Sequence, residues 1–509
     1  MSDAVADPVA ESEWKRLDSR TIAVTALRLL GVAVVAAIPG CFWLSRALPL
    51  WLALVIAAAA TVVLVGAGVL VDRLRWSRTR YRALPDRFEL HTGIVVRSRR
   101  SLQRERIRTV DITASPLLRL FRLVHVKVGT GEQASGDGSS LSLNPVGRDD
   151  AEWLRTTLLD RTGATEDEAA RSGVLSTMDL SWVRYAPISF VTPALGTAAF
   201  GGVLQVADWF GMQSDILGWV VDLLSELSLV GGILLLLAVG LVVGAVAAVA
   251  LFVEMWWQFR LEREPGGTLR VRRGLLTTRS ISVEERRLRG VELVEPLGNR
   301  LAGAARVDAV ATGLARREEE QKAAHNTLHP AAPRQLAHRI AAAVLREPTS
   351  PTETVGLRAH PKAALGRRIR WALIALVVLE LPLVVLGLTV TSVLLHVAWI
   401  SAVVLLPVSV ALAFAAYRSL GHGITGGYLV TRHGAVRRGT VALRRSGVIG
   451  WTIRQSVFQR RSGLLTVTAT TAAGSQAYSA YDVGEHEGLA FAEEAVPGLL
   501  TPFLERADR

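Results

Sequence analysis

Three related stretches decide the fold: RIRTVDIT at residues 106–113, RLRGVELV at 287–294 and GVIGWTIR at 447–454. Apolar and other side chains alternate along them, which is the period of a β-strand with one buried face. The second stretch lies 181 residues after the first, and the third stretch lies 341 residues after the first. The same two shifts align the whole of residues 93–130 without a gap. The chain therefore contains a threefold internal repeat.

The columns of this alignment keep their residue type. Val110, Val291 and Trp451 share one apolar column, and the neighbouring apolar columns behave in the same way. A glycine recurs at the turn between two short apolar runs, where a tight hairpin loop needs a positive φ angle. One column holds an arginine in all three copies: Arg119, Arg300 and Arg460. Chance does not explain so many matches under fixed shifts, so we interpret each copy as one structural unit.

Each copy has the pattern of a β domain closed by a helix. Short alternating runs bounded by turn residues predict about six or seven strands, with Val110 and Ile112 on the inner face of the first copy. The closing helices are expected at Asp149 to Leu159, Pro333 to Leu345 and Glu485 to Val496. In the first of these, Trp153, Leu154 and Leu158 share one face.

The composition requires a membrane. Half of the 509 residues are apolar and 20% are charged, whereas an average soluble domain carries about 25% charge. Six long apolar runs predict transmembrane helices in three hairpins. The runs are Thr21 to Leu44, Leu50 to Val71, Tyr185 to Ala207, Leu227 to Val253, Trp371 to Val390 and Ser392 to Tyr417. Proline and glycine residues make the run from Tyr185 the weakest of the six.

Arginine positions set the expected orientation. Five arginines lie between Arg73 and Arg82, after the second run, and three precede the fifth run. The connection from Ala207 to Ser228 instead carries four acidic residues and no Lys or Arg. The positive-inside rule then places both termini and all large polar segments in the cytoplasm. The connector itself is amphipathic and is expected to lie on the outer leaflet.

The expected fold class is a multi-domain integral membrane protein with six transmembrane helices in three hairpins and three cytoplasmic β domains. The expected segments are a polar tail at 1–20, hairpin 1 at 21–72, β domain 1 at 73–160, a linker at 161–184, hairpin 2 with its external connector at 185–254, β domain 2 at 255–346, a linker at 347–368, hairpin 3 at 369–417 and β domain 3 at 418–505.

The repeated unit resembles the bacterial pleckstrin-homology (PH) domain family of the YdbS/YdbT type. The resemblance rests on Tyr81-Arg82 followed by FELHTGI at 88–94, RIRTV at 106–110 and SPLLRL at 115–120. The second copy keeps PLGNRL at 296–301. The third copy departs from the pattern, with Val457 in place of the proline and Gly447 in place of Arg106. The resemblance covers almost the whole chain from Thr21 and is more specific for fold than for function.

The resemblance implies a PH-like fold, a curved seven-stranded sheet closed by a C-terminal helix. It implies a long, three-domain member of the family, located in the bacterial inner membrane, that catalyses no assigned reaction. A smaller membrane protein with one PH domain is an expected partner, and self-association is the alternative. A phosphoinositide-binding loop is not carried over, because a PH-like fold alone does not specify a ligand.

Basic residues are the candidate binding residues. Arg99, Arg100, Arg104 and Arg106 cluster in the first copy, and the recurring arginine column adds one residue per copy. Such residues can bind anionic lipid headgroups or a partner, and the alternative is a solvated basic patch without lipid selectivity. Nucleic acid is not an expected partner, because the net charge of +13 gathers near the membrane runs. Cys41 is the only cysteine, and no cofactor, metal or catalytic residue is expected.

Three polar residues fall inside the apolar runs. Glu380 is at the middle of the fifth run, where a carboxyl group is costly and often functional. His396 is near the start of the sixth run and is expected at the interface. Arg28 is expected to reach the cytoplasmic surface or to pair with Glu380.

The most favoured function is a non-enzymatic membrane scaffold that binds a protein partner or lipid headgroups, in envelope stress or antimicrobial resistance. The alternative is a small-molecule or lipid transporter built from the six helices, with Glu380 as its polar centre. A membrane hydrolase is disfavoured, because no catalytic motif stands out in the sequence.

Overall fold

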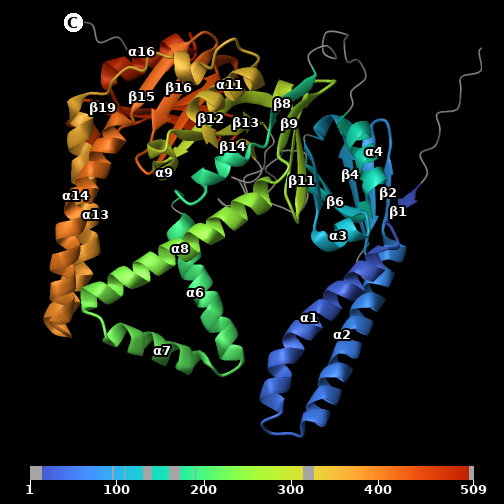
Figure 1. The fold of residues 1–509 in the computed structure, drawn as a ribbon. Coiled ribbons are helices and arrows are strands. Elements are labelled where there is room, and N and C mark those ends of the chain that lie inside the picture. Colours follow the sequence, from blue (N-terminus) through green and yellow to red (C-terminus); the bar gives the residue numbers. More distant parts are fainter. Residues whose placement is uncertain are drawn as a thin grey trace, which may run out of the picture. The chain divides into compact units, whose positions relative to one another are not determined.

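The computed structural model describes residues 14–93, 97–107, 109–129, 140–159, 172–189, 191–312 and 326–503. The chain divides into two compact units, Met1–Glu285 and Arg286–Arg509. The first unit contains the first two hairpins, the first copy of the repeat and the beginning of the second copy. The second unit contains the rest of the second copy, the third hairpin and the third copy (Figure 1).

Long apolar helices form the hairpins of the first unit (Figure 1). They are α1 (Thr21–Leu44), α2 (Leu50–Arg78), α6 (Val191–Trp209) and α8 (Leu229–Trp256), and α7 (Gln213–Ser225) connects the last two. Helices α6 and α8 approach closely at small residues. A Cβ atom on Gly196 would lie 2.2 Å from the carbonyl oxygen of Gly240, and one on Gly244 would lie 2.1 Å from that of Thr192. Glycine at these positions therefore permits the close approach of the two helices.

The third hairpin, in the second unit, consists of α13 (Lys362–Thr389) and α14 (Val393–Arg418), which lie side by side (Figure 1). Among the described residues, five helices are long and apolar enough to cross a membrane: α1, α2, α8, α13 and α14. Helix α6 corresponds to the weakest expected span and is outside this group, so the sixth span stays a prediction.

The strands follow the repeat. In the first copy they are β2 (Arg80–Ala83), β3 (Arg87–Thr92), β4 (Ser98–Gln103), β5 (Thr109–Ala114), β6 (Leu123–Gly129) and β7 (Ser140–Gly147), and β1 (Lys15–Arg16) pairs with β2. In this copy the short helix α3 (Pro116–Leu120) follows β5, and the closing helix is α4 (Arg148–Leu159).

The second copy has strands β9 (Arg260–Glu264), β10 (Thr268–Arg273), β11 (Thr278–Glu284), β12 (Leu288–Pro296), β13 (Ala304–Ala311) and β14 (Thr327–Pro333), preceded by β8 (Gly173–Thr177). Its helices are α9 (Leu297–Leu301) and α11 (Arg334–Leu345), and the short α12 (Pro351–Thr354) lies in the linker that follows. The third copy has β15 (Gly421–Thr425), β16 (Tyr428–His433), β17 (Arg437–Arg444), β18 (Val448–Arg454), β19 (Leu464–Thr471) and β20 (Ala477–Gly484), with helices α15 (Val457–Arg460) and α16 (Glu485–Ala495). Short 3₁₀ turns are η1 (Arg104–Arg106), η2 (Leu180–Tyr185), η3 (Glu285–Arg287), η4 (Arg445–Gly447) and η5 (Thr501–Phe503).

The turn glycines behave as predicted. Gly93, Gly274 and Gly434 follow β3, β10 and β16, and their φ angles are 130°, 115° and 106°. A Cβ atom would lie 2.0 Å from the Thr277 carbonyl oxygen at Gly274 and 1.9 Å from the Arg437 carbonyl oxygen at Gly434. Only glycine fits both the backbone angle and the space, which explains why the residue recurs.

The sheets do not stay within one copy, which differs from the expected single seven-stranded sheet per copy. In the first copy, β2, β3 and β4 belong to a sheet of order β1-β2-β3-β4. Strands β5 to β7 instead join the first strands of the second copy, in the order β7-β6-β5-β11-β10-β9-β8. The second half of copy two joins the first half of copy three in the same way, in the order β14-β13-β12-β17-β16-β15, and β18-β19-β20 form a smaller sheet. Successive copies are thus joined by continuous sheets.

Two strand pairs make these connections: β5 with β11, here called the first junction, and β12 with β17, the second junction. The first junction pairs Val110 with Ser282 and the second pairs Val291 with Ala442. Under the repeat shifts Val110 aligns with Val291, and Ser282 aligns with Ala442. The register is therefore identical at both junctions, as expected where an inner face must stay buried.

The core of the first copy lies between its two half-sheets and α4. Phe88, Val110 and Leu154 are fully buried there, and Ile112 is 8% exposed. Burial of each large apolar side chain stabilises the fold by about 1.5–3 kcal/mol. Trp153 does not join this face as expected. It is 41% exposed and lies under the ammonium group of Lys15, 4.3 Å from the ring centre.

Candidate functional site

Four of the expected binding arginines lie together on β4 and η1. Arg99 and Arg100 are on β4, which is the last strand of its sheet among the described residues. Arg104 and Arg106 form the ends of η1, and the Arg104 amide donates to the Asp86 carbonyl at 2.8 Å. A row of charged side chains on an edge strand disfavours pairing with another strand. The cluster thus gives the first copy a basic, protected edge.

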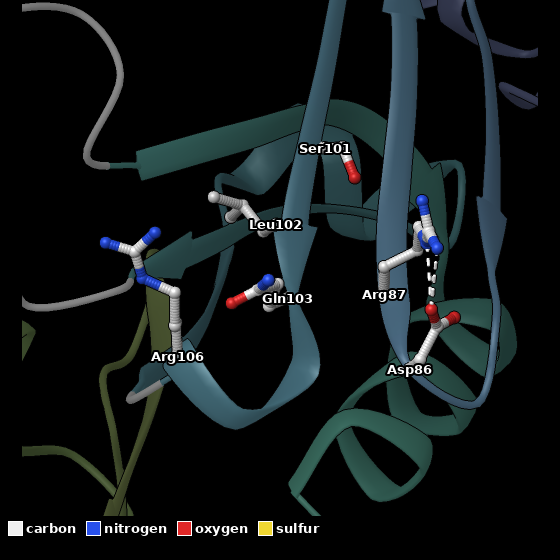
Figure 2. Close-up of a pocket in the computed structure, with 6 residues that line it drawn as sticks. All are labelled: Asp86, Arg87, Ser101, Leu102, Gln103 and Arg106. Carbon is white, nitrogen blue, oxygen red and sulfur yellow. Dashed lines mark hydrogen bonds and ion pairs between the residues drawn. The ribbon is translucent and has the colours of Figure 1, made fainter.

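A cavity of about 320 Å³ lies beside this edge, lined by Asp86, Arg87, Ser101, Leu102, Gln103 and Arg106 (Figure 2). Asp86 and Arg87 form an ion pair at 2.9 Å. In Figure 2 this pair lies on one side of the group and the Arg106 guanidinium lies on the other. The cavity therefore combines a guanidinium group with a hydroxyl and an amide, which are groups that can hold an anion.

The ion pair limits the charge of this cavity. The Arg87 guanidinium holds the pKa of the Asp86 carboxyl below its ordinary value, so Asp86 is ionised at neutral pH. With one acid and two arginines, the lining carries a single net positive charge. Such a site suits a singly charged carboxylate or phosphodiester better than a doubly charged phosphate group.

The recurring arginine column has a structural explanation that the sequence did not supply. Arg119, on α3, donates to the carbonyl oxygens of Leu275 and Leu276, the latter at 3.3 Å. These carbonyls belong to the β10–β11 turn of the next copy, beside the first junction. Arg300 makes a longer contact with the start of the third copy, 3.5 Å from the Ser419 hydroxyl at the end of α14. The first two arginines of the column thus bind the copy that follows them.

Arg460 is the third member of this column. It lies on α15 and is exposed. In the described part of the chain its side chain makes no hydrogen bond or ion pair. The contact that Arg119 makes to a following copy has no counterpart at Arg460 among the described residues.

Charged side chains support the first junction from outside the paired strands. Arg270 on β10 contacts Glu152 of α4 at 2.6 Å and Glu264 of β9 at 3.1 Å. Arg155 of α4 contacts the same two acids, at 2.9 Å and 2.6 Å. This four-residue network links the closing helix of the first copy to the sheet of the second.

The second junction has ion pairs between its two strands. Glu295 of β12 contacts Arg438 of β17 at 2.6 Å and Arg334 of α11 at 2.7 Å. Glu292 of β12 contacts Arg437 of β17 at 3.1 Å. Glu295 is 2% exposed, so its charge depends on these arginines. The two acids of β12 and the adjacent pair of arginines on β17 were the available sequence signal, but only the register shows that they meet.

Glu380 lies in α13, as the sequence predicted, and is buried against α14. The Ser401 hydroxyl donates to its Oε2 atom at 3.0 Å. The Oε1 atom has no hydrogen-bond partner among the described residues. The antiparallel hairpin therefore brings Ser401, rather than His396, to the depth of Glu380. A buried carboxyl oxygen without a hydrogen bond is costly in a membrane.

His396 and Arg28 lie apart from this carboxyl contact. The Nδ1 atom of His396 is 3.0 Å from the Ser392 carbonyl one turn earlier, and the ring is exposed. Arg28, on α1, is also exposed. Burial, together with the nearby charges of Arg75 and Arg28, lowers the pKa of His125 on β6. Arg28 thus lies near the β domain end of its helix, while its suggested pairing with Glu380 stays a prediction.

A buried polar cluster in the third copy was missed by the sequence analysis. Asp482 is fully buried and contacts Arg367, Arg368 at 3.0 Å, and the Gln459 amide at 2.9 Å. Arg367 and Arg368 are two of the three arginines before the fifth run, which the sequence analysis uses only to assign orientation. They lie far from Asp482 in the sequence, so no local spacing could reveal the contact.

Two buried histidines adjoin Asp482. The Nδ1 atom of His422 lies 3.1 Å from Nε2 of His360, whose Nδ1 is 3.2 Å from the Asp482 carbonyl. Burial lowers the pKa of His422 to about 4, with help from the neighbouring His360 and Arg358. Burial also lowers the pKa of His360, so both rings are neutral at pH 7 and serve as packing and hydrogen-bonding groups. Over the described residues, no three His, Cys, Asp or Glu side chains gather as a metal site.

Comparisons with known proteins agree with the resemblance seen in the sequence. The profile of a family described as "Bacterial PH domain" matches residues 26–162 and 374–495, about half of the chain. The UPF0699 transmembrane protein YdbT of Bacillus subtilis (strain 168) is 22% identical over 430 residues, which cover 81% of this chain and 84% of that protein. No solved structure matches the chain. The expected family and the transmembrane character are thereby confirmed.

Proposed function

The chain belongs to the bacterial PH domain family, and on that premise we propose that it is a non-enzymatic scaffold of the bacterial inner membrane. In this proposal its PH-like copies bind a protein partner or lipid headgroups. Both termini and all three β domains lie in the cytoplasm, and the physiological setting is envelope stress or antimicrobial resistance. A PH-like fold does not by itself specify a ligand, so the argument depends on the surfaces of the copies.

The sharing of strands between copies is the observation that carries this proposal. At both junctions, one half of a PH-like copy binds the half that follows it, in the same register. Strand pairing of this kind is a common mode of protein recognition, in which main-chain hydrogen bonds give affinity and side chains give specificity. The copies therefore already act as binding modules for domains of their own kind.

The basic edge of the first copy supports binding of lipid headgroups. The four arginines of β4 and η1 follow the arginine-rich end of α2, which would lie at the anionic cytoplasmic leaflet. The neighbouring cavity, with one net positive charge, fits a phosphodiester headgroup. Each arginine near such a surface adds about 1 kcal/mol of attraction, which weakens as salt concentration rises.

Affinity purification of the full chain in mild detergent tests the proposal, with mass spectrometry of both proteins and lipids. We expect a stoichiometric protein partner, in particular a smaller membrane protein with one PH domain, together with enriched anionic lipid. An unrelated six-span protein purified in parallel defines the background. A single enriched small molecule with neither a partner nor anionic lipid would refute the scaffold and favour transport.

Transport is the second candidate function, because the Oε1 atom of Glu380 is buried without a hydrogen bond in the described structure. Substitution Glu380→Gln removes the ionisable group and keeps the shape and the Ser401 contact. A scaffold predicts that the variant still assembles, retains its partner and supports the cell as before. Loss of the cellular phenotype in a variant that assembles normally would favour transport. The matched control is Glu226→Gln, at the end of α7, where the side chain is exposed.

A further inference from the structure

The strand β18 stands in a different environment from its two counterparts. In the first copy β5 lies between β6 and β11, and in the second copy β12 lies between β13 and β17. In the third copy β18 pairs with β19 and, within the described residues, ends its sheet. The side of β18 that corresponds to each junction is therefore an open edge.

Exposure confirms that this edge lacks a neighbour. Ile112 is 8% exposed and Leu293 is 2% exposed, each beside a filled junction, whereas Ile453 in the same column is 38% exposed. Ile449 is 65% exposed, in a column that holds Arg289 in the second copy. An edge strand with exposed apolar side chains and few charges is a template for an added strand.

The helix after β18 also has exposed apolar side chains. Val457 and Phe458 on α15 are 67% and 58% exposed. Arg460, the counterpart of the junction-binding Arg119, makes no side-chain hydrogen bond or ion pair in the described part of the chain. The strand and the arginine are the parts that contact the next copy at the first junction, and among the described residues their counterparts in the third copy contact no such copy.

The filled junctions show which strand fits this edge. The three central columns of the bound strand are Ser280-Ile281-Ser282 at the first junction and Thr440-Val441-Ala442 at the second. All three residues are buried at the second junction, as are Ile281 and Ser282 at the first. An incoming strand must therefore carry small or apolar, uncharged residues in these columns, because burial of an unpaired charge is costly.

A second copy of this chain does not meet that requirement. Its available strand is β4, which has Arg99-Arg100-Ser101 in the same columns. In the junction register Arg100 would face Thr452 and Arg99 would face Ile453. The acids that occupy the Thr452 column in the other copies, Asp111 and Glu292, are missing, and Arg454 adds a further positive charge. Head-to-tail self-association therefore leaves two arginines without acidic partners.

We propose that the open edge of β18 binds the third strand of a PH-like domain in a different protein, the counterpart of β11 and β17, in the register of the two junctions. That strand carries uncharged residues opposite Trp451, Thr452 and Ile453, and the turn before it accepts a hydrogen bond from Arg460. This inference rests on the proposed scaffold function, because it locates the surface where the protein partner binds. The third copy then extends the array of shared sheets into the partner.

Disulfide trapping on the full chain in detergent tests the register directly. The probe is a synthetic peptide with the sequence of residues 274–285, the strand that fills the first junction. The protein carries Cys41→Ser and one new cysteine, Thr452→Cys or Ile453→Cys. The junction register pairs these positions with the columns of Ile281 and Ser280, respectively.

We expect Thr452→Cys to couple to an Ile281→Cys peptide at least about tenfold faster than to a Ser280→Cys peptide, and Ile453→Cys to show the reverse preference. Because each protein variant is compared with itself, partial misfolding of one variant cannot produce the reversal. Equal coupling to both peptides, or none with either protein, would overturn the proposal. The β4 sequence of residues 97–104, with cysteine at Arg100, is the matched control and should couple poorly.

Two further results separate this inference from the proposed function. A ladder of cross-linked chains from Thr452→Cys combined with Arg100→Cys would show that a second copy fills the edge, which overturns the assigned partner. If the affinity-purified partner remains bound to an Ile449→Lys/Ile453→Lys variant, the edge is not its binding site, while the scaffold function stands. Loss of the partner from this variant, with in-register trapping of the peptide, supports the proposal.

Discussion

The two junctions join the same columns in the same register, yet different charges support them. At the first junction the network of Arg155, Arg270, Glu152 and Glu264 lies beside the paired strands and is partly hydrated, since the Glu152 side chain is 36% exposed. At the second junction Glu295 is on the paired strand itself, with a side chain only 3% exposed. The shared feature is the main-chain pairing and the buried apolar columns.

The register of the two junctions therefore does not depend on one particular set of ion pairs. Charged pairs that differ between two otherwise equivalent interfaces provide selectivity more than the common stability. The difference in exposure between Glu152 and Glu295 also predicts which junction loses more stability when a charge is removed. Removing the charge or the partners of a nearly inaccessible acid costs more folding stability than the same change at a hydrated acid.

The largest effect is expected from Glu295→Gln. The substitution keeps the shape but leaves Arg438 and Arg334 without their buried acid, which should cost about 3 kcal/mol of local stability. Amide hydrogen exchange of β12 and β17 should accelerate by about a hundredfold, since 1.4 kcal/mol is tenfold. The control is Glu494→Gln, whose pair with Arg358 at 3.2 Å has both side chains more than half exposed. An equal effect of the two substitutions would contradict the ranking.

Arg270→Met should have a smaller effect, at the first junction. Methionine keeps the apolar stem of the side chain. Glu152 and Glu264 keep their contacts with Arg155 and regain water in place of Arg270, because both are partly exposed. We expect a loss of about 1–2 kcal/mol, measured as faster exchange of β10 and β11 amides. Arg260→Met, in a more exposed pair of the same sheet, should change exchange little. If Arg270→Met accelerated amide exchange more than Glu295→Gln does, side-chain exposure would not explain how sensitive the two junctions are to loss of a charge.

The arginine column permits a matched comparison between a filled junction and the open edge. Arg119→Ala removes hydrogen bonds to the β10–β11 turn and should cost about 0.5–1 kcal/mol, seen as faster exchange in that turn. Arg460→Ala in the isolated chain should leave exchange unchanged. With the partner bound, Arg460→Ala should weaken binding. A destabilised isolated Arg460→Ala chain would point to an internal contact instead.

Much of this architecture was available from the sequence because it depends on local or periodic signals. The repeat shifts, the turn glycines and the inner positions of Val110 and Ile112 follow from steric limits on φ and from the two-residue period of a strand. Apolar runs of about twenty residues likewise located the helices of the hairpins.

The sharing of strands could not be predicted, because alternation identifies a buried face but not the strand that lies at an edge. For the same reason Arg119 was interpreted as a lipid or partner ligand, although it donates to the next copy. Asp482 and its arginines come together only through the tertiary fold. Contacts of high sequence separation leave no trace in a single sequence unless they recur, as the arginine column does.

The smallest expected effect is a difference in pH dependence between the junctions. Burial raises the pKa of Glu152, but the charges of Arg270 and Arg155 outweigh it, and the net pKa is lowered. Its stabilisation is therefore present above the ordinary carboxyl pKa near 4.3 and is lost as pH falls further. Burial also raises the pKa of Glu292. The nearby Arg437 lowers it, Asp308 raises it and Arg306 lowers it, and the net pKa is raised.

Glu292 therefore changes stability with pH in the opposite direction to Glu152. A raised pKa in the folded chain means that this residue opposes folding as pH rises, so acidification from pH 7 relieves a cost at the second junction. Between pH 7 and 5, exchange of β12 and β17, corrected for intrinsic rates, should slow relative to β5 and β11. Glu292→Gln should abolish that difference and thereby separates it from the protonation of His422, which destabilises the same unit as pH falls. If the variant keeps the full pH response, Glu292 is not its source, and the two junctions differ only in the burial of Glu295.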